Sequence, residues 1–97
     1  MSNTAILKFT LKDFDNIIND YDIVKFLNIQ IQNDIVCVWA VCNIGIDRIR
    51  NKKYNVFKVG TGPSWSLEHW NDENYIGTIQ ENGYVWHYFW EEIEDLI

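Results

Sequence analysis

The chain has 97 residues, enough for one domain with a modest core. Its net charge of −6 and its pI near 4.6 argue against a protein that grips the phosphate backbone of a nucleic acid. No apolar run reaches the roughly 18 residues of a membrane span and no signal-peptide pattern is present, so we expect neither a membrane protein nor secretion by the usual route.

The first half of the chain predicts three strands. Residues 5–11 alternate loosely and form a first strand, whereas residues 12–22 are acidic and Asn-rich and form either one short helix or an irregular crossover. Residues 23–32 and 35–43 form two strands joined by Asn33-Asp34. The second of these strands is apolar on both faces, so we expect it to be central and covered on both sides.

A two-residue turn at Asn33-Asp34 fixes the pairing of these strands. One face then pairs Ile31–Val36, Ile29–Val38 and Leu27–Ala40, and the other pairs Gln32–Ile35, Gln30–Cys37, Asn28–Trp39 and Phe26–Val41. The side-chain amides of Gln32, Gln30 and Asn28 lie on the same face as Trp39 and need hydrogen-bond partners. They therefore bond either to other groups of the protein or to a polar ligand. Cys37 and Cys42 point to opposite faces and read as buried small hydrophobes in a reducing compartment.

The middle of the chain carries most of the positive charge. Residues 44–53 form a basic loop that includes Arg48, Arg50 and Lys53, and residues 54–59 form the next strand. This patch could bind an anionic small molecule, drive self-association or simply be a solvated loop. The turn Gly60-Thr61-Gly62 that follows is either a small anion nest or a tight turn fixed by Pro63.

The last third predicts a hairpin around Asn82-Gly83, because both central residues of a type I′ turn need a positive φ. One face holds the aromatic row of Trp86, Tyr88 and Trp90, which a core, a subunit or a ligand must cover. The predicted pairs are Glu81–Tyr84, Ile79–Trp86, Gly77–Tyr88, Tyr75–Trp90, Gln80–Val85, Thr78–His87 and Ile76–Phe89. A structural hydrogen bond between His87 and Thr78 is expected from this register.

Two segments flank that hairpin. The loop 64–74 carries Trp65, His69 and Trp70, and a loop of this length in a small domain favours a functional or interface role. Residues 91–97 form an acidic C-terminal tail. The run from Val59 to Ile97 holds eight carboxylates and no basic side chain.

Nothing in the sequence indicates an enzyme. His69 and His87 are the general-base candidates with an ordinary pKa near neutrality, but no nucleophile motif or spaced carboxylate pair accompanies them. No zinc spacing and no full nucleotide-binding fingerprint is present, so we expect no metal and no cofactor. Single-stranded nucleic acid is not an expected partner, since the aromatic hairpin lies in the half without positive charge.

The chain resembles a family of small uncharacterised bacteriophage proteins of similar length. The matching elements are Leu7-Lys8-Phe9, Gln30–Asn33, Cys37–Ala40, Gly60–Gly62, Tyr75–Thr78 with Gln80, and Gly83 with Val85–His87 and Phe89. The match covers most of the chain and departs from the family after the first strand and after Trp90. It implies a phage origin and a host-cytoplasmic setting, and it transfers no activity and no catalytic residue.

We therefore expect a single mainly β domain over residues 1–97, an antiparallel meander of about five or six strands built as a partly open barrel or a sandwich, with at most one short helix. The leading functional hypothesis is a homo-oligomeric phage counter-defence protein that sequesters a small, nucleotide-like anionic signal at a subunit interface. The candidate ligand-binding residues are Gln30, Trp39, Arg48, Arg50, Lys53, Gly60, Thr61, Gly62, Trp65, Thr78 and His87. The alternatives are an acidic protein–protein inhibitor of a host enzyme, which could act as a nucleic-acid mimic on a host defence protein, and a minor virion or assembly component.

Overall fold

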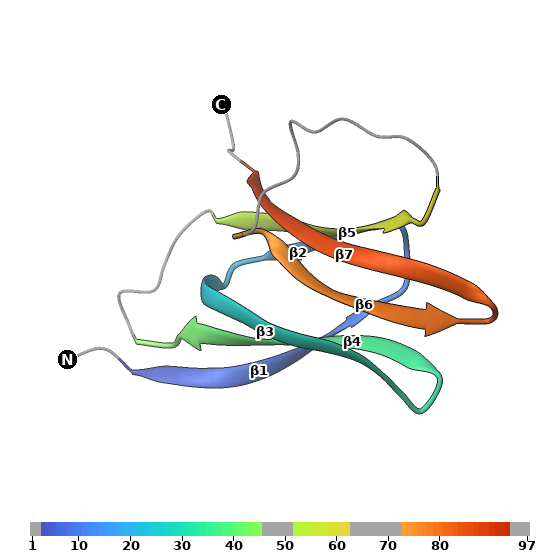
Figure 1. Cartoon of the computed structure of the whole chain (residues 1–97). Coiled ribbons are helices and arrows are strands. Elements are labelled where there is room, and N and C mark those ends of the chain that lie inside the picture. The colour runs from blue at the N-terminus through green and yellow to red at the C-terminus, as the bar shows by residue number, and fades with distance from the viewer. Residues whose placement is uncertain (1–2, 46–51, 63–72, 94–97) are drawn as a thin grey trace.

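The chain folds into two antiparallel sheets stacked face to face, and the computed structural model describes residues 3–45, 52–62 and 73–93 (Figure 1). Sheet A contains, in spatial order, β1 (Thr4–Leu11), β4 (Ile35–Asn43) and β3 (Asp22–Gln32). Sheet B contains β2 (Asp15–Asn19), β5 (Lys53–Gly60), β7 (Tyr84–Ile93) and β6 (Tyr75–Glu81). The expected mainly β class is confirmed in its sandwich form.

The segment between the first two predicted strands is a strand and not a helix. The Asn16 side chain accepts hydrogen bonds from the backbone N–H groups of Lys12 and Asp13, at 2.9 and 3.1 Å, and so turns the chain just before β2. Ile18 then enters the core while Ile17 stays exposed, which is the period of a strand. The near-helical spacing of the apolar residues here is misleading, because they are divided between the turn and the strand.

The described residues therefore form seven strands instead of five or six, and the order of the strands is not that of a meander. β4 lies between β1 and β3, and β5 lies between β2 and β7. The chain leaves sheet A after β1, forms the edge strand β2 in sheet B and returns to sheet A with β3. Hairpin signals in the sequence are local, so they could not predict these crossings between layers.

The β3–β4 hairpin has the predicted turn and most of the predicted register. Asn33 and Asp34 have φ values of 52° and 66°, as a type I′ turn requires. The pairs Ile31–Val36, Ile29–Val38, Gln32–Ile35, Gln30–Cys37 and Asn28–Trp39 are confirmed. Beyond them a bulge at Leu27 shifts the register, so Phe26 pairs with Ala40 and enters the core, and the predicted Leu27–Ala40 and Phe26–Val41 pairs are wrong.

The β6–β7 hairpin behaves in the same way. Asn82 and Gly83 have φ values of 53° and 85°, and five predicted pairs are confirmed, from Glu81–Tyr84 to Gly77–Tyr88. A bulge at Ile76 then pairs Tyr75 with Phe89, so the predicted Tyr75–Trp90 and Ile76–Phe89 pairs are wrong. The bulge moves Tyr75 from the core side of sheet B to its outer face.

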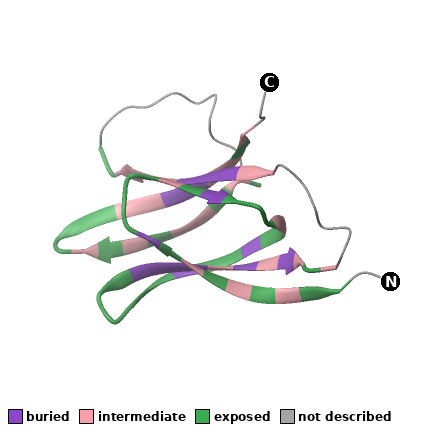
Figure 2. Ribbon diagram, turned by 180° about the vertical axis from the view of Figure 1, so that it is seen from behind, coloured by how far each residue is buried: buried purple, intermediate pink, exposed green. Residues whose placement is uncertain are grey.

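The core lies between the two sheets and covers the aromatic row of β7. Buried positions (purple) occur on strands of both layers in Figure 2. Tyr88 is buried, and Trp86 and Trp90 pack against the core from β7. The fully buried positions Val38, Ala40, Cys42 and Val56 come from the central strands β4 and β5. Burial raises the pKa of the Tyr88 hydroxyl to about 12, with a smaller contribution from the Glu81 carboxylate.

Cys37 and Cys42 are both buried and free, and they lie on opposite faces of β4 as predicted. Cys42 faces the core, where burial and then the Asp22 carboxylate raise the pKa of its thiol. Cys37 lies on the outer face of sheet A. There the Lys8 ammonium donates to Gln32 across β4, at 2.8 Å, and the register places this bond over Cys37. Long polar side chains thus cover the outer face of the central strand.

The two lateral seams of the sandwich differ. On one side β3 packs against β6, where an added Cβ on Gly77 would lie 2.9 Å from Cγ2 of the buried Ile29. A glycine is therefore required for this close approach between the layers. On the other side, a cavity of about 670 Å³ opens between β1 and β2. The sheets are thus joined along one edge and open along the other.

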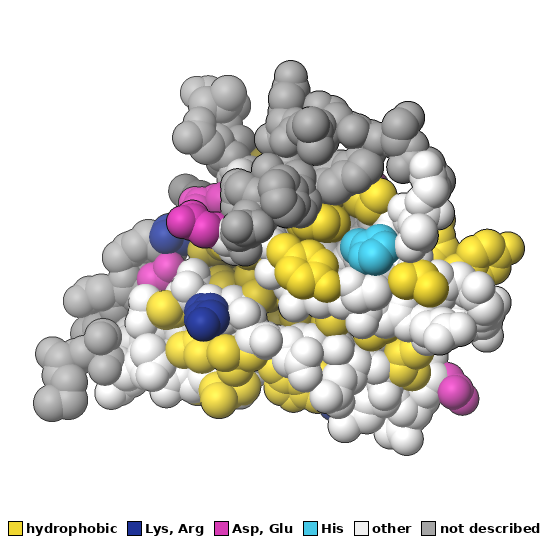
Figure 3. All heavy atoms as spheres, in the orientation of Figure 1, with side chains coloured by type: hydrophobic (Ala, Val, Ile, Leu, Met, Phe, Trp, Pro, Cys, Tyr) yellow, Lys and Arg dark blue, Asp and Glu magenta, His cyan; other side chains and the backbone are white. Residues whose placement is uncertain are grey.

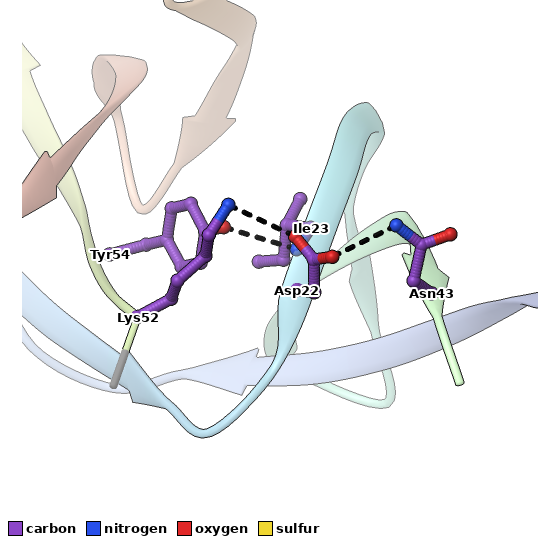
Figure 4. Close-up of polar contacts among 5 residues, drawn as sticks. All are labelled: Asp22, Ile23, Asn43, Lys52 and Tyr54. Carbon is purple, nitrogen blue, oxygen red and sulfur yellow. Dashed lines mark hydrogen bonds and ion pairs between the residues drawn. The ribbon is translucent and has the colours of Figure 1, made fainter. Parts of the chain in front are cut away.

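A polar corner holds β3, β4 and the start of β5 together (Figure 4). The Asp22 carboxylate accepts from Asn43 Nδ2 at 2.9 Å and pairs with Lys52 Nζ at 3.2 Å. The backbone N–H of Ile23 donates to the Tyr54 hydroxyl at 3.1 Å. Burial raises the pKa of Tyr54, and the hydrogen bond to Asp22 raises the pKa of Lys52. This corner fixes the point at which the chain passes from sheet B to sheet A.

Candidate functional site

The candidate site is a row of hydrogen-bonded polar side chains on the outer face of sheet B. His87 lies on β7, opposite Thr78 of β6, as the register predicted. Thr78 Oγ1 lies 3.0 Å from His87 Nδ1, and Thr61 Oγ1 lies 2.7 Å from His87 Nε2. The Tyr75 hydroxyl extends the row with a hydrogen bond to Thr78. We call Thr61, His87, Thr78 and Tyr75 the hydroxyl–histidine row.

Both ring nitrogens of His87 are occupied by hydroxyl groups, which can donate or accept. Either neutral tautomer is therefore satisfied, with the direction of the hydrogen bonds reversed along the row. The imidazole is held in one orientation, and the hydroxyls of Thr61 and Tyr75 form the two ends of the row. Such an arrangement presents donors and acceptors at fixed positions to a polar molecule.

Aromatic rings lie directly beside this row. The Phe57 and Phe89 rings stack with centroids 5.9 Å apart, and the Tyr75 ring lies 5.4 Å from Phe89. Tyr75 remains 45% exposed, so its face is accessible to a planar group. Figure 3 shows the histidine (cyan) bordered by hydrophobic side chains (yellow). The outer face of sheet B thus combines fixed hydroxyls with an aromatic surface.

A buried asparagine supports the neighbouring part of the same face. Asn55 on β5 is 8% exposed, and its Oδ1 accepts from the Asn16 backbone N–H at 3.0 Å. Its Nδ2 donates to Asp15 at 3.0 Å and to Glu91 at 3.3 Å. The amide therefore links β2, β5 and β7 and holds two carboxylates near the face, which makes this part acidic.

The Gly60-Thr61-Gly62 turn contributes a side chain to the row. The Thr61 N–H donates to the Val85 carbonyl at 3.3 Å, so this amide belongs to the sheet. Gly62 has a φ of 110°, which a residue with a side chain rarely adopts. The turn places the Thr61 hydroxyl beside His87, and this is the part of the turn that faces the candidate site.

The sequence-derived candidates fall into four groups. Gly60, Thr61, Gly62, Thr78 and His87 come together on the outer face of sheet B. Gln30 and Trp39 lie on the outer face of sheet A, on the far side of the core. Lys53 begins β5, about 23 Å along the strand from Gly60 at 3.3 Å per residue. Arg48, Arg50 and Trp65 lie outside the described residues.

The structure agrees only in part with what the sequence predicts for the amides of β3 and for the acidic tail. Asn28 and Gln30 are exposed and make no hydrogen bond to another described side chain, whereas Gln32 binds Lys8. Glu91, Glu92 and Ile93, the start of the expected acidic tail, belong to β7, and residues 94–97 lie outside the described ranges. The loop residues His69 and Trp70 also lie outside them.

Sequence reasoning missed two contributors to this surface, Tyr75 and Asn55, and the inward direction of Lys58. The register predicted from the turn places Tyr75 on the core side. It is wrong there because the bulge at Ile76 cannot be recognised from the residues around it. Asn55 stands out in the sequence only as one polar residue in a strand, although its amide joins three strands. Lys58 belongs by charge to the basic segment, yet β-strand alternation from the buried Val56 indicates that it points inward.

The described part of the chain contains neither a cluster of metal ligands nor a helix that could span a membrane. No three His, Cys, Asp or Glu side chains in residues 3–45, 52–62 and 73–93 are close enough to hold a metal ion. These ranges also contain no helix of the length and apolar character that crossing a membrane would demand.

Residues 2–95 match the family model of a domain of unknown function, DUF7352. The chain belongs to this family. The match covers nearly the whole DUF7352 protein, including both sheets and the hydroxyl–histidine row. No curated protein and no solved structure shows significant similarity to it. The family therefore brings no assigned activity to the site.

Proposed function

We propose that this DUF7352 protein is a phage-encoded, non-enzymatic binding protein that acts in the host cytoplasm against a host defence. In this proposal it sequesters a small, nucleotide-like signal at an interface between two copies of the chain. The observation that carries the proposal is the hydroxyl–histidine row beside the exposed Tyr75 ring. Its fixed hydroxyls suit the ribose and base edges of a nucleotide, and the ring suits stacking on a base.

The arrangement of His87 favours binding over catalysis. Its two nitrogens bond to the hydroxyls of Thr61 and Thr78, and among the hydrogen bonds of the row no carboxylate orients the imidazole as a base. A general base must reach the proton it removes, and here both ring positions are already engaged with protein hydroxyls. The row therefore supports recognition by shape and hydrogen bonding.

The placement of the candidates explains why two copies are invoked. Gln30 and Trp39 lie on one outer face of the sandwich, and Thr78 with His87 lie on the other. A ligand that contacts both sets has to lie between sheet A of one copy and sheet B of the next. Lys53 and the Gly60–Gly62 turn lie at opposite ends of β5, so a small ligand can contact both only if a second copy brings its own Lys53 to the turn.

The test is a thermal-shift screen with cyclic nucleotides and ADP-ribose derivatives. A ligand at 100 times its Kd adds about 2.7 kcal/mol of stability, which raises the Tm of a domain of this size by roughly 10–20 °C. Thr78→Val cuts both hydrogen bonds of Thr78 and should abolish the shift. Thr4→Val, an exposed position at the start of β1 and four residues from Lys8, the partner of Trp39, is the matched control and should retain it. Failure of the whole panel would count against sequestration of a nucleotide.

A second candidate function rests on the acidic second half of the chain. The absence of Lys and Arg after Lys58, with eight carboxylates, suits an inhibitor that occupies a basic site on a host enzyme. Glu92 is exposed on β7, whereas Glu91 is engaged with Asn55, so Glu92→Lys tests charge without breaking that contact. Together with reversal of Glu94 and Asp95, it should abolish inhibition and leave ligand sequestration intact.

A further inference from the structure

A pocket of about 560 Å³ opens at the end of the sandwich, away from the hydroxyl–histidine row. It lies where β1 ends, where β5 ends and where the β6–β7 hairpin turns. Phe14, Lys58, Tyr84 and Trp86 contribute its aromatic and cationic lining. Its volume falls within the range of small-molecule sites, about 300–1,000 Å³.

Lys58 gives this pocket an unusual charge. Its place on β5, opposite Tyr88 and two residues from the buried Val56, directs the side chain to the inner face of sheet B. The ammonium lies 4.3 Å from the centre of the Trp86 ring and 4.8 Å from that of Phe14. These are cation–π contacts, which hold the charge in place without neutralising it.

The Lys58 ammonium makes no ion pair and no hydrogen bond with a side chain in the described ranges. A partly buried cation normally gains a carboxylate or several acceptors, because water no longer fully solvates it. Here the two rings orient the group and leave its outer side for an anion. The position is therefore ready to accept a negatively charged group from a ligand.

The rings around Lys58 are themselves accessible. Phe14 is 59% exposed and Tyr84 is 66% exposed, large values for aromatic side chains that line a pocket. The Trp86 ring lies between them, 5.3 Å from Phe14 at 84° and 6.0 Å from Tyr84 at 33°. A planar molecule laid on these rings would cover apolar area that is now in water.

The other charges of the pocket limit what the anion can be. Besides Lys58, the lining contains Lys12 and three carboxylates, those of Asp13, Asp34 and Glu81. Three negative and two positive groups would repel a polyphosphate, whereas one negative charge placed at Lys58 would be accepted. We propose that this pocket is a ligand site for a planar aromatic molecule that carries a single negative charge, its ring against Phe14 and Tyr84 and its anion on Lys58.

The test uses two fluorescent probes that differ in charge. 8-Anilinonaphthalene-1-sulfonate carries one sulfonate, and N-phenyl-1-naphthylamine has the same ring system without it. The sulfonate probe should saturate at one per chain. Lys58→Met should weaken it about tenfold, the size of one lost charge-assisted contact, and leave the neutral probe unchanged. Lys58→Arg should retain most of the affinity, and the exposed Lys25→Met should leave both probes as in the parent protein.

A separate variant tests how much the Tyr84 ring contributes to probe binding. Tyr84→Ser removes a mostly exposed ring, so the fold should persist, and both probes should bind more weakly. Equal binding of the sulfonate probe by Lys58→Met and the parent protein, or saturation at several probes per chain, would overturn the proposal. Thr78→Val should leave the sulfonate probe bound, so failure here and failure of nucleotide sequestration are separate results.

Discussion

Substitution of Gly77 gives a testable prediction, because the absence of a side chain there allows β6 and β3 to pack closely. In Gly77→Ala the new Cβ would lie 2.9 Å from Ile29 Cγ2, against about 3.5–4.0 Å for a comfortable carbon contact. Ile29 is 4% exposed and belongs to the core, so its branched side chain has no free space to enter. Overpacking of this kind costs about 1–3 kcal/mol.

Alanine also lowers the conformational entropy of the unfolded chain, which stabilises the folded state by about 0.4–1 kcal/mol. The net loss should therefore be about 1–2 kcal/mol, or a fall in Tm of roughly 5–15 °C. Urea unfolding followed by tryptophan fluorescence measures it. Gly45→Ala is the matched control, because no heavy atom lies within 4 Å of its added Cβ. It should be neutral or slightly stabilising.

A double-mutant cycle isolates the contact itself. Ile29→Ala alone should lose about 2–5 kcal/mol as a large-to-small core change. In that background Gly77→Ala should no longer destabilise, because the opposing methyl group is gone. If Gly77→Ala is neutral in the parent protein, or costs as much in the Ile29→Ala background as in the parent protein, the close seam described above is refuted.

Three further predictions concern buried groups. Tyr54→Phe removes the acceptor of the Ile23 N–H and should lower the free energy of unfolding by about 1 kcal/mol in urea titrations. Because the folded-state pKa of Tyr88 is raised to about 12, its contribution is complete below pH 10 and is lost as the pH rises through 12. The loss of about 2–3 kcal/mol should appear as a falling Tm in alkaline buffers, and the fall should be smaller in Tyr88→Phe, where only groups such as Tyr54 still contribute. Cys37 and Cys42 should resist a thiol reagent at pH 8 in the native protein and both react in urea, and rapid native labelling would contradict their burial.

The sequence was most informative where the structure is local. Asn33-Asp34 and Asn82-Gly83 predicted two type I′ turns, and period two then placed most pairs of both hairpins correctly. Each register failed at a bulge, at Leu27 and at Ile76. A bulge adds one residue without a fixed sequence signature, so counting from the turn goes wrong beyond it.

The remaining features depend on contacts between distant segments. β2 escaped prediction because a short edge strand with an exposed Ile17 carries little apolar signal of its own. Thr78 and His87 were paired correctly from the hairpin, but the arrival of Thr61 from the far end of β5 depends on sheet order. Strand order across the two layers is set by the packing of the whole core, which no single hairpin encodes.

The central claim is that the outer face of sheet B binds a small molecule in infected cells. Native mass spectrometry of the protein purified from phage-infected, defence-active cells, beside protein from uninfected cells, tests it most directly. We predict an added mass of a few hundred daltons per site after infection only, kept in Thr4→Val and lost in Thr78→Val. Identical bare protein from both sources would contradict sequestration and favour the inhibitor of a host enzyme.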